Sequence, residues 1–92
     1  MKYVLKQTGI TEDGRMVIGG VYEMYATYGL PLDVVFDGIR TANAVIDWLD
    51  FMRDAEKNGM NKSRVLSMIE PPLTDVFGSE YRDVVIEKLM GV

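Results

Sequence analysis

Three aspartates in the stretch "VIDWLDFMRDAEKNG" have the type and spacing to bind a cation or a basic partner. Asp47, Asp50 and Asp54, here called the aspartate row, recur at helical intervals and therefore share one face of a helix. Carboxylates on one face can coordinate a divalent cation or pair with lysine and arginine side chains of another protein. A helix surface without loop carbonyls is a poor metal cage, and the calcium-loop pattern D-x-[DN]-x-[DN]-G is absent. We therefore expect no metal and no cofactor, and we favour a protein partner.

The composition excludes most catalytic chemistry. The chain has no histidine and no cysteine, so it lacks the commonest general base near neutral pH, thiolate nucleophiles and thiolate zinc ligands. Its serines lack the G-x-S-x-G elbow, and its glycines form neither G-x-x-x-x-G-K-[ST] nor G-x-G-x-x-G. The sequence therefore predicts that the protein is not an enzyme.

The chain is acidic, and the acidity is local. Its 14 acidic residues outnumber its 10 basic residues, which gives a net charge of −4. The whole imbalance falls within residues 31–56, which contain six acidic residues and only two basic ones, Arg40 and Arg53. A chain with this balance is a poor ligand for nucleic-acid phosphates, which need clustered lysine and arginine. We therefore expect a protein partner with a basic surface and no direct nucleic-acid binding.

The acidic segment 31–56 contains the predicted partner-binding surface. Asp33 and Asp37 extend the negative field of the aspartate row, and Phe51 at the edge of the row supplies an apolar anchor. The predicted partner-binding residues are Asp33, Asp37, Asp47, Asp50, Phe51 and Asp54.

An ordinary amphipathic helix explains the same row without a function. Val45, Trp48, Leu49, Met52 and Ala55 gather on the opposite side, so the aspartates could simply form the solvated face. The spacing predicts that Trp48, Leu49 and Met52 are buried. The sequence leaves open whether the acidic face is functional or only solvated.

These residues must be positioned by a mainly helical α+β domain. Ninety-two residues make a single domain, 1–92. Strand-compatible segments on either side of Asp13-Gly14 predict an N-terminal two-stranded β-hairpin over about residues 2–18, packed on helices because two strands alone are unstable in water. Helical spacing predicts four to five short α-helices. Their expected ranges are about 20–28, 31–40, 45–57, 61–70 and 79–90.

Glycine and proline corners set the expected helix ends at 29–31, 58–61 and 71–72. We expect the fourth helix to end at Pro71-Pro72, because neither residue can donate a backbone hydrogen bond and Pro72 disfavours helix at Pro71. The segment "DVVF" at 33–36 also fits a strand. The spacing and the following Asp37-Gly38 favour a helix there, but both interpretations remain open.

These observations favour a non-catalytic acidic binding protein that engages a basic surface of a partner through residues 31–56. In size, acidity and lack of catalytic residues, the chain resembles the small inhibitors and accessory proteins that bacteriophages encode, some of which mimic nucleic-acid charge. This resemblance of profile implies an inhibitory or accessory role. No apolar stretch is long enough for a signal peptide or a membrane span, so we expect a cytoplasmic protein.

Two other function classes remain open. The first is a small homo-oligomeric structural or assembly protein, held together by exposed aromatic and methionine side chains. The second is a DNA-binding regulator that uses residues 59–70, with Lys62 and Arg64 at the start of a recognition helix. Its preceding helix is acidic, and two basic residues are few for a DNA contact.

Overall fold

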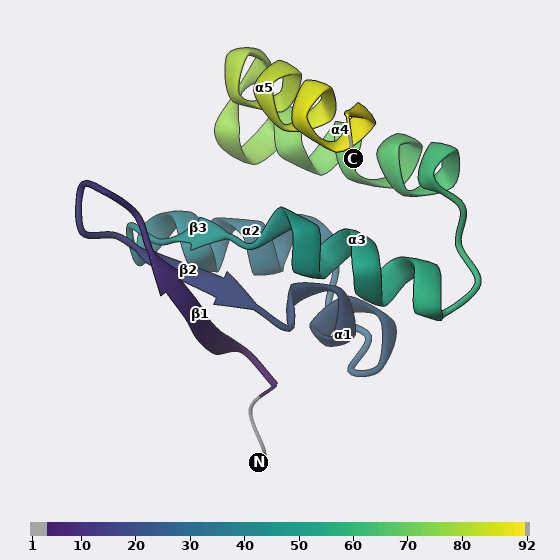
Figure 1. Ribbon diagram of the computed structural model, residues 1–92, viewed down its shortest axis with the longest axis horizontal. Coiled ribbons are helices and arrows are strands. Elements are labelled where there is room, and N and C mark those ends of the chain that lie inside the picture. Colours follow the sequence, from purple (N-terminus) through teal and green to yellow (C-terminus); the bar gives the residue numbers. More distant parts are fainter. Residues whose placement is uncertain (1–3, 92) are drawn as a thin grey trace.

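The computed structural model describes residues 4–91 and shows a mainly helical α+β fold (Figure 1). The strands are β1 (Lys6–Ile10), β2 (Met16–Gly19) and β3 (Val45–Ile46), in the sheet order β1-β2-β3. The helices of the described part are α1 (Val21–Ala26), α2 (Leu32–Thr41), α3 (Trp48–Lys57), α4 (Lys62–Phe77) and α5 (Ser79–Met90). The predicted fold class is confirmed, and residues 33–36 lie in a helix.

The N-terminal hairpin forms around the predicted Asp-Gly turn. β1 and β2 pair antiparallel, and the turn closes with a hydrogen bond of 2.8 Å from Thr11 N to Arg15 O. Gly14 has a φ of 87°, a backbone conformation that glycine adopts without steric cost. The register shifts between Gln7 and Gly9, so Thr8 lies at a β-bulge. The first two residues of the expected range 2–18 lie outside the described residues.

The segment 45–46 was expected to begin a helix, and this prediction is wrong. Val45 and Ile46 form β3, which pairs parallel with β2, and α3 begins only at Trp48. Both residues are β-branched and suit a strand. A parallel strand also needs a partner strand, here β2, and a crossover connection between the two, which α1 and α2 provide. Helical spacing within the segment could not reveal that partner.

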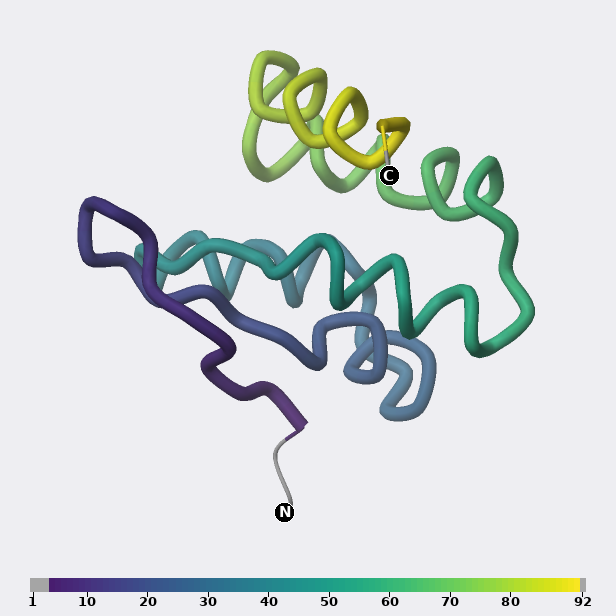
Figure 2. Tube along the Cα trace, in the orientation of Figure 1, coloured from purple at the N-terminus to yellow at the C-terminus, as the bar shows by residue number. Residues whose placement is uncertain are grey.

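The expected break at Pro71-Pro72 is also wrong, because α4 continues through both prolines to Phe77. Each proline removes one helical hydrogen bond. Just beyond the prolines, the Thr74 hydroxyl donates to the Glu70 carbonyl at 2.9 Å and accepts from Arg82 Nη1 of α5 at 3.1 Å. Figure 2 shows α4 as two coiled parts joined by a straighter stretch. Packing of α4 against α2 and α5 outweighs the local preference to end the helix.

The core lies where α2, α3, α4 and α5 meet. Figure 1 shows α4 and α5 together on one side of α2 and α3, with the hairpin and α1 on the other side. Ring contacts connect the layers: Phe36 of α2 meets Phe77 of α4 at 6.2 Å between centroids, and Tyr22 of α1 meets Phe51 of α3 at 5.5 Å. The largest fully buried side chains are Phe36, Phe51, Ile69, Leu73, Leu89, Val21 and Val65.

The predicted burial of α3 is right for two residues and wrong for one. Trp48 and Met52 are buried, whereas Leu49 is 43% exposed. Phe51 takes the inward position instead, because α1 packs across that side of α3. Within residues 4–91, every helix is too short or too polar to cross a lipid bilayer.

Candidate functional site

Asp47 and Asp50 hold together the corner where the sheet meets α3. Asp47 is the N-cap of α3: its Oδ1 accepts from the Asp50 backbone N–H at 3.1 Å, and its Oδ2 accepts from the Thr8 hydroxyl at 2.7 Å. Asp50 Oδ2 accepts from the backbone N–H of Gly20 at 2.9 Å. The two carboxylates therefore connect α3 to the hairpin and to the start of α1.

Two glycines make room for this corner. Gly20 has a φ of 82°, and a Cβ there would collide with the backbone carbonyl oxygen of Val4. A Cβ on Gly19 would lie 2.7 Å from Thr8 Cγ2 and 3.1 Å from Asp50 Oδ2. The Gly-Gly pair thus permits the close approach of α3, the hairpin and α1.

Phe51 is fully buried, with 0% of its surface exposed, so its predicted role as an anchor for a partner is wrong. Its ring meets the Tyr22 ring edge-on at 5.5 Å. On α3 alone, Phe51 falls at the boundary between the apolar and acidic sides. The packing of α1 moves that boundary, and nothing in the local sequence of α3 indicates it.

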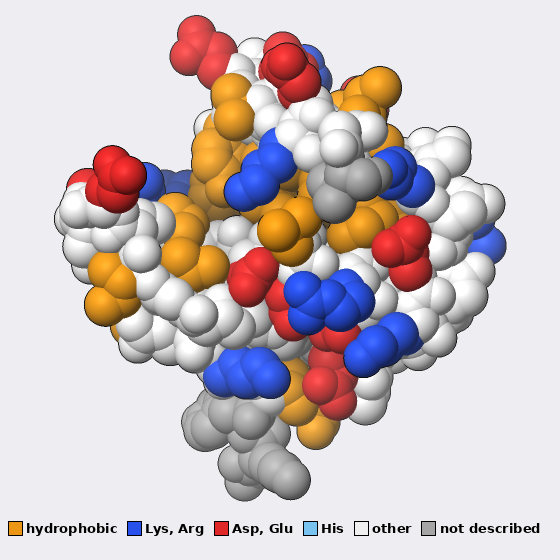
Figure 3. Space-filling model, viewed as in Figure 1, with side chains coloured by type: hydrophobic (Ala, Val, Ile, Leu, Met, Phe, Trp, Pro, Cys, Tyr) orange, Lys and Arg blue, Asp and Glu red, His pale blue; other side chains and the backbone are white. Residues whose placement is uncertain are grey.

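Asp33 and Asp37 lie on the exposed surface of α2. Asp37 forms an ion pair with Arg40, with 2.7 Å between Oδ1 and Nη2. Among residues 4–91, no hydrogen bond or ion pair joins Asp33 or Asp37 to the aspartate row. Figure 3 shows acidic and basic side chains interleaved on the viewed face, rather than one continuous acidic field. The six predicted residues are therefore divided among different environments.

Asp54 lies in a different environment from the rest of the row. It is half-buried and lines a polar hollow of about 230 Å³ between α1 and α3, here called the α1–α3 hollow. The residues of this hollow are Tyr22, Glu23, Ala26, Thr27, Asp54 and Asn58. Among the described residues, neither the Glu23 nor the Asp54 carboxylate has a hydrogen-bond or ion-pair partner. Two unpartnered carboxylates around one polar hollow attract a positively charged group.

Glu23 was not among the predicted partner-binding residues. Glu23 and Asp54 are far apart in the chain, and only the packing of α1 against α3 brings them to the same hollow. No spacing rule within either helix indicates this neighbourhood.

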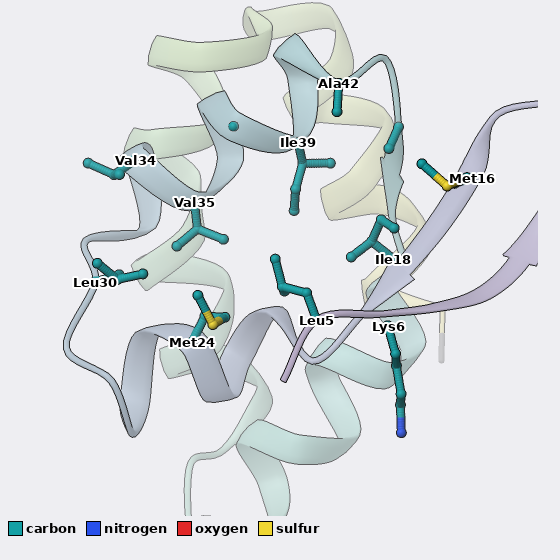
Figure 4. A pocket seen from close by; sticks show the side chains of 12 residues that line it. Leu5, Lys6, Met16, Ile18, Met24, Leu30, Val34, Val35, Ile39 and Ala42 are labelled. Carbon is teal, nitrogen blue, oxygen red and sulfur yellow. The ribbon is translucent and has the colours of Figure 1, made fainter. Parts of the chain in front are cut away.

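An apolar groove lies on the other side of α1, between the hairpin and α2 (Figure 4). It has a volume of about 400 Å³, and among the described residues that line it Lys6 alone is charged. Figure 4 shows Leu5, Ile18 and Ile39 directed toward its centre, while the Lys6 side chain points away. The groove is lined by Leu5, Lys6, Met16, Ile18, Met24, Leu30, Val34, Val35, Gly38, Ile39, Ala42 and Ala44.

The described residues also include one acid with a perturbed pKa. A hydrogen bond from the Thr11 hydroxyl, together with the guanidinium of Arg15, lowers the pKa of Asp13 from its ordinary value. This group lies in the exposed hairpin turn. In residues 4–91, no three acidic side chains converge closely enough to share a metal ion.

Comparison of the chain with protein-family models, with curated proteins and with solved structures found no match.

Proposed function

We propose that this chain is a non-catalytic binding protein that receives a basic side chain of a partner protein in the α1–α3 hollow. The observation that supports the proposal is the pair of carboxylates, Glu23 and Asp54, that face one polar hollow without a partner among the described residues. An inhibitory or accessory role, as the resemblance in profile implies, is part of this proposal.

The hollow suits an arginine or lysine side chain. A guanidinium presents several N–H donors in one plane, so it can contact two carboxylates and a neighbouring oxygen such as the Thr27 hydroxyl. The half-burial of Asp54 reduces solvent screening, so a charge pair there is stronger than one on an open helix surface. We favour arginine, because its planar fork loses less freedom for each hydrogen bond that it forms.

The rest of the predicted surface has a smaller part in this proposal. Asp47 and Asp50 are engaged within the fold, and Phe51 is in the core. Asp33 and Asp37 remain exposed, and together they contribute attraction at longer range. The partner-binding surface that we propose therefore keeps Asp54 as its centre and adds Glu23.

The two other function classes use other surfaces. The assembly protein depends on the apolar groove beside α2. The DNA-binding regulator depends on the start of α4, where Arg64 lines a hollow with Tyr22 and Tyr25. No feature of residues 4–91 favours the regulator over a binding protein, and it stays a prediction.

A defined probe tests the hollow. We would titrate the ¹⁵N-labelled protein with N-acetyl-arginine amide and follow the backbone amide signals. We expect the largest shift changes in α1 and the end of α3, near Thr27 and Asn58, and we expect them to weaken as salt increases. The double variant Glu23→Gln/Asp54→Asn should lose these changes.

The matched control is Glu70→Gln/Asp75→Asn, which removes the same charge from exposed positions on α4. It should keep the response of the unmodified chain. Shift changes spread evenly over all acidic residues, or equal losses in both double variants, would contradict a specific site. Affinity capture from the native host, with the same variants as bait, would then identify the partner.

A further inference from the structure

The apolar groove beside α2 has an exposed apolar rim. Of the eight exposed large hydrophobic side chains among residues 4–91, three line this groove: Met16, Leu30 and Val34, with 44%, 37% and 55% of their surfaces exposed. Figure 4 shows Leu30 and Val34 on one side of the hollow space and Met16 on the other. A concentration of exposed apolar side chains around a concave surface is typical of a binding interface.

We propose that this groove is the interface of a homodimer, in which a second copy of the chain covers it. The inference goes beyond the proposed function and shares no residue with the α1–α3 hollow. In a two-fold symmetric dimer the two copies use the same surface, so the apolar rim of each groove would be buried against the other copy.

Charge complementarity favours a second copy as the occupant. Lys6 lies at the β1 rim of the groove, its side chain is exposed and directed away from the groove centre (Figure 4), and among the described residues it has no ion pair. Asp37 is exposed on α2, one helical turn beyond the lining residue Val34, and its partner within the chain is Arg40, which is itself exposed. In a two-fold interface each contact occurs twice, so Lys6 of each copy can oppose Asp37 of the other.

The position of the excess charge supports the same conclusion. The two elements on either side of the groove, β1 and α2, carry Lys6 and Arg40 against Asp33 and Asp37, a balanced set, whereas the chain as a whole has a net charge of −4. Two acidic copies therefore meet with little net repulsion at this face, and a strongly basic partner gains little there.

The sheet and the rim supply contacts for such a dimer. β1 begins at the groove, and in the described sheet its outer edge is unpaired. Edge strands of this kind readily pair with another chain. Met16 has an unbranched, flexible side chain that can fill irregular apolar space, so it can enter the groove of the opposite copy.

Sedimentation equilibrium tests the proposal. We expect the chain to reach about twice its mass of 10.4 kDa as its concentration is raised. Val34→Asp should return it to a single-chain mass, because the new charge would be buried without a partner. The matched control is Val84→Asp, which makes the same change at a position of α5 that is 64% exposed, and it should leave the dimer intact.

A charge exchange keeps the test decisive if circular dichroism shows that Val34→Asp is unfolded. Lys6→Asp should weaken the dimer roughly tenfold, since it places like charges opposite each other. Adding Asp37→Lys in the same chain should restore the dimer, because the exchanged charges again oppose each other across the two-fold axis.

Three results would overturn the homodimer. The first is a single-chain mass at concentrations up to roughly 1 mM. The second is equal behaviour of Val34→Asp and Val84→Asp, when both are folded. The third is a charge exchange that fails to restore the dimer. Glu23→Gln/Asp54→Asn should not change the mass, so failure of the arginine titration and failure of the dimer are separate outcomes.

Discussion

The two ends of the aspartate row show how one residue type on one helix acquires different roles. At the start of α3, Asp47 and Asp50 accept hydrogen bonds from Thr8 and Gly20, which belong to the hairpin and to the corner before α1. Further along the same helix, Asp54 faces the α1–α3 hollow, where no described residue donates to its carboxylate. The difference lies in the donors that surround each acid and not in the acids themselves.

This contrast separates acids that stabilise the fold from acids that remain available to a partner. A carboxylate that satisfies a backbone N–H removes the cost of leaving that donor unpaired. A carboxylate without a donor contributes little to stability, and it repels a neighbouring carboxylate such as Glu23. We therefore expect stability measurements to distinguish the two ends of α3.

The largest effect should come from Phe51, which lies on α3 between the two groups of acids. Phe51→Ala should lower the free energy of unfolding by about 3–5 kcal/mol, because it leaves a cavity in the core. Urea denaturation measures this loss. A loss of less than about 1 kcal/mol would mean that Phe51 is a surface residue, and Phe51 would again be a candidate anchor for a partner.

Asp50→Ala should have the next largest effect. It removes the acceptor of the Gly20 N–H, and we expect a loss of about 1–3 kcal/mol in the same denaturation experiment. Asp50→Asn should recover part of the loss, because its amide oxygen can accept the same hydrogen bond. If Asp50→Ala and Asp54→Ala cost the same, the contrast between the two ends of the row does not exist.

Asp54→Asn should leave the free energy of unfolding within about 0.5 kcal/mol of the unmodified chain. Its carboxylate has no donor among the described residues, and its removal relieves repulsion from Glu23. A clear loss of stability in the urea experiment would show that Asp54 has a structural partner, and the proposed function would then lose its central residue.

The smallest effect should come from Asp13, an acid with internal donors that lies in an exposed turn. Its pKa is lowered from the ordinary value of 3.8, so its ionised form is favoured in the folded state. The resulting stabilisation is fully present above that value and is lost as the pH falls through the lowered pKa.

Thermal unfolding of the unmodified chain and of Asp13→Asn measures this contribution. The variant should melt slightly earlier at a pH of about 7, and the two should converge as the pH falls through the lowered pKa of Asp13 and its carboxyl becomes protonated. A difference in melting temperature that increases as the pH falls would contradict the expected stabilisation by ionised Asp13.

The sequence alone predicted features that depend on neighbours along the chain. Helical spacing predicted a helix over about residues 31–40, and α2 spans Leu32–Thr41 with its apolar side buried. A helix was also predicted to begin near residue 61, and Asn61 caps α4 by accepting from the Arg64 backbone N–H at 2.9 Å. Periodicity, caps and turns can be predicted in this way because their partners lie within a few residues.

Only the tertiary structure decided where the buried side of α3 ends and which acids remain available. β3 needed β2 beside it, and α4 needed α2 and α5 to continue through its prolines. The packing of α1 buried Phe51 and brought Glu23 to Asp54. The donors to Asp47 and Asp50 come from residues far away in the sequence, so the position of these acids on a helix could not reveal whether they are bound or free.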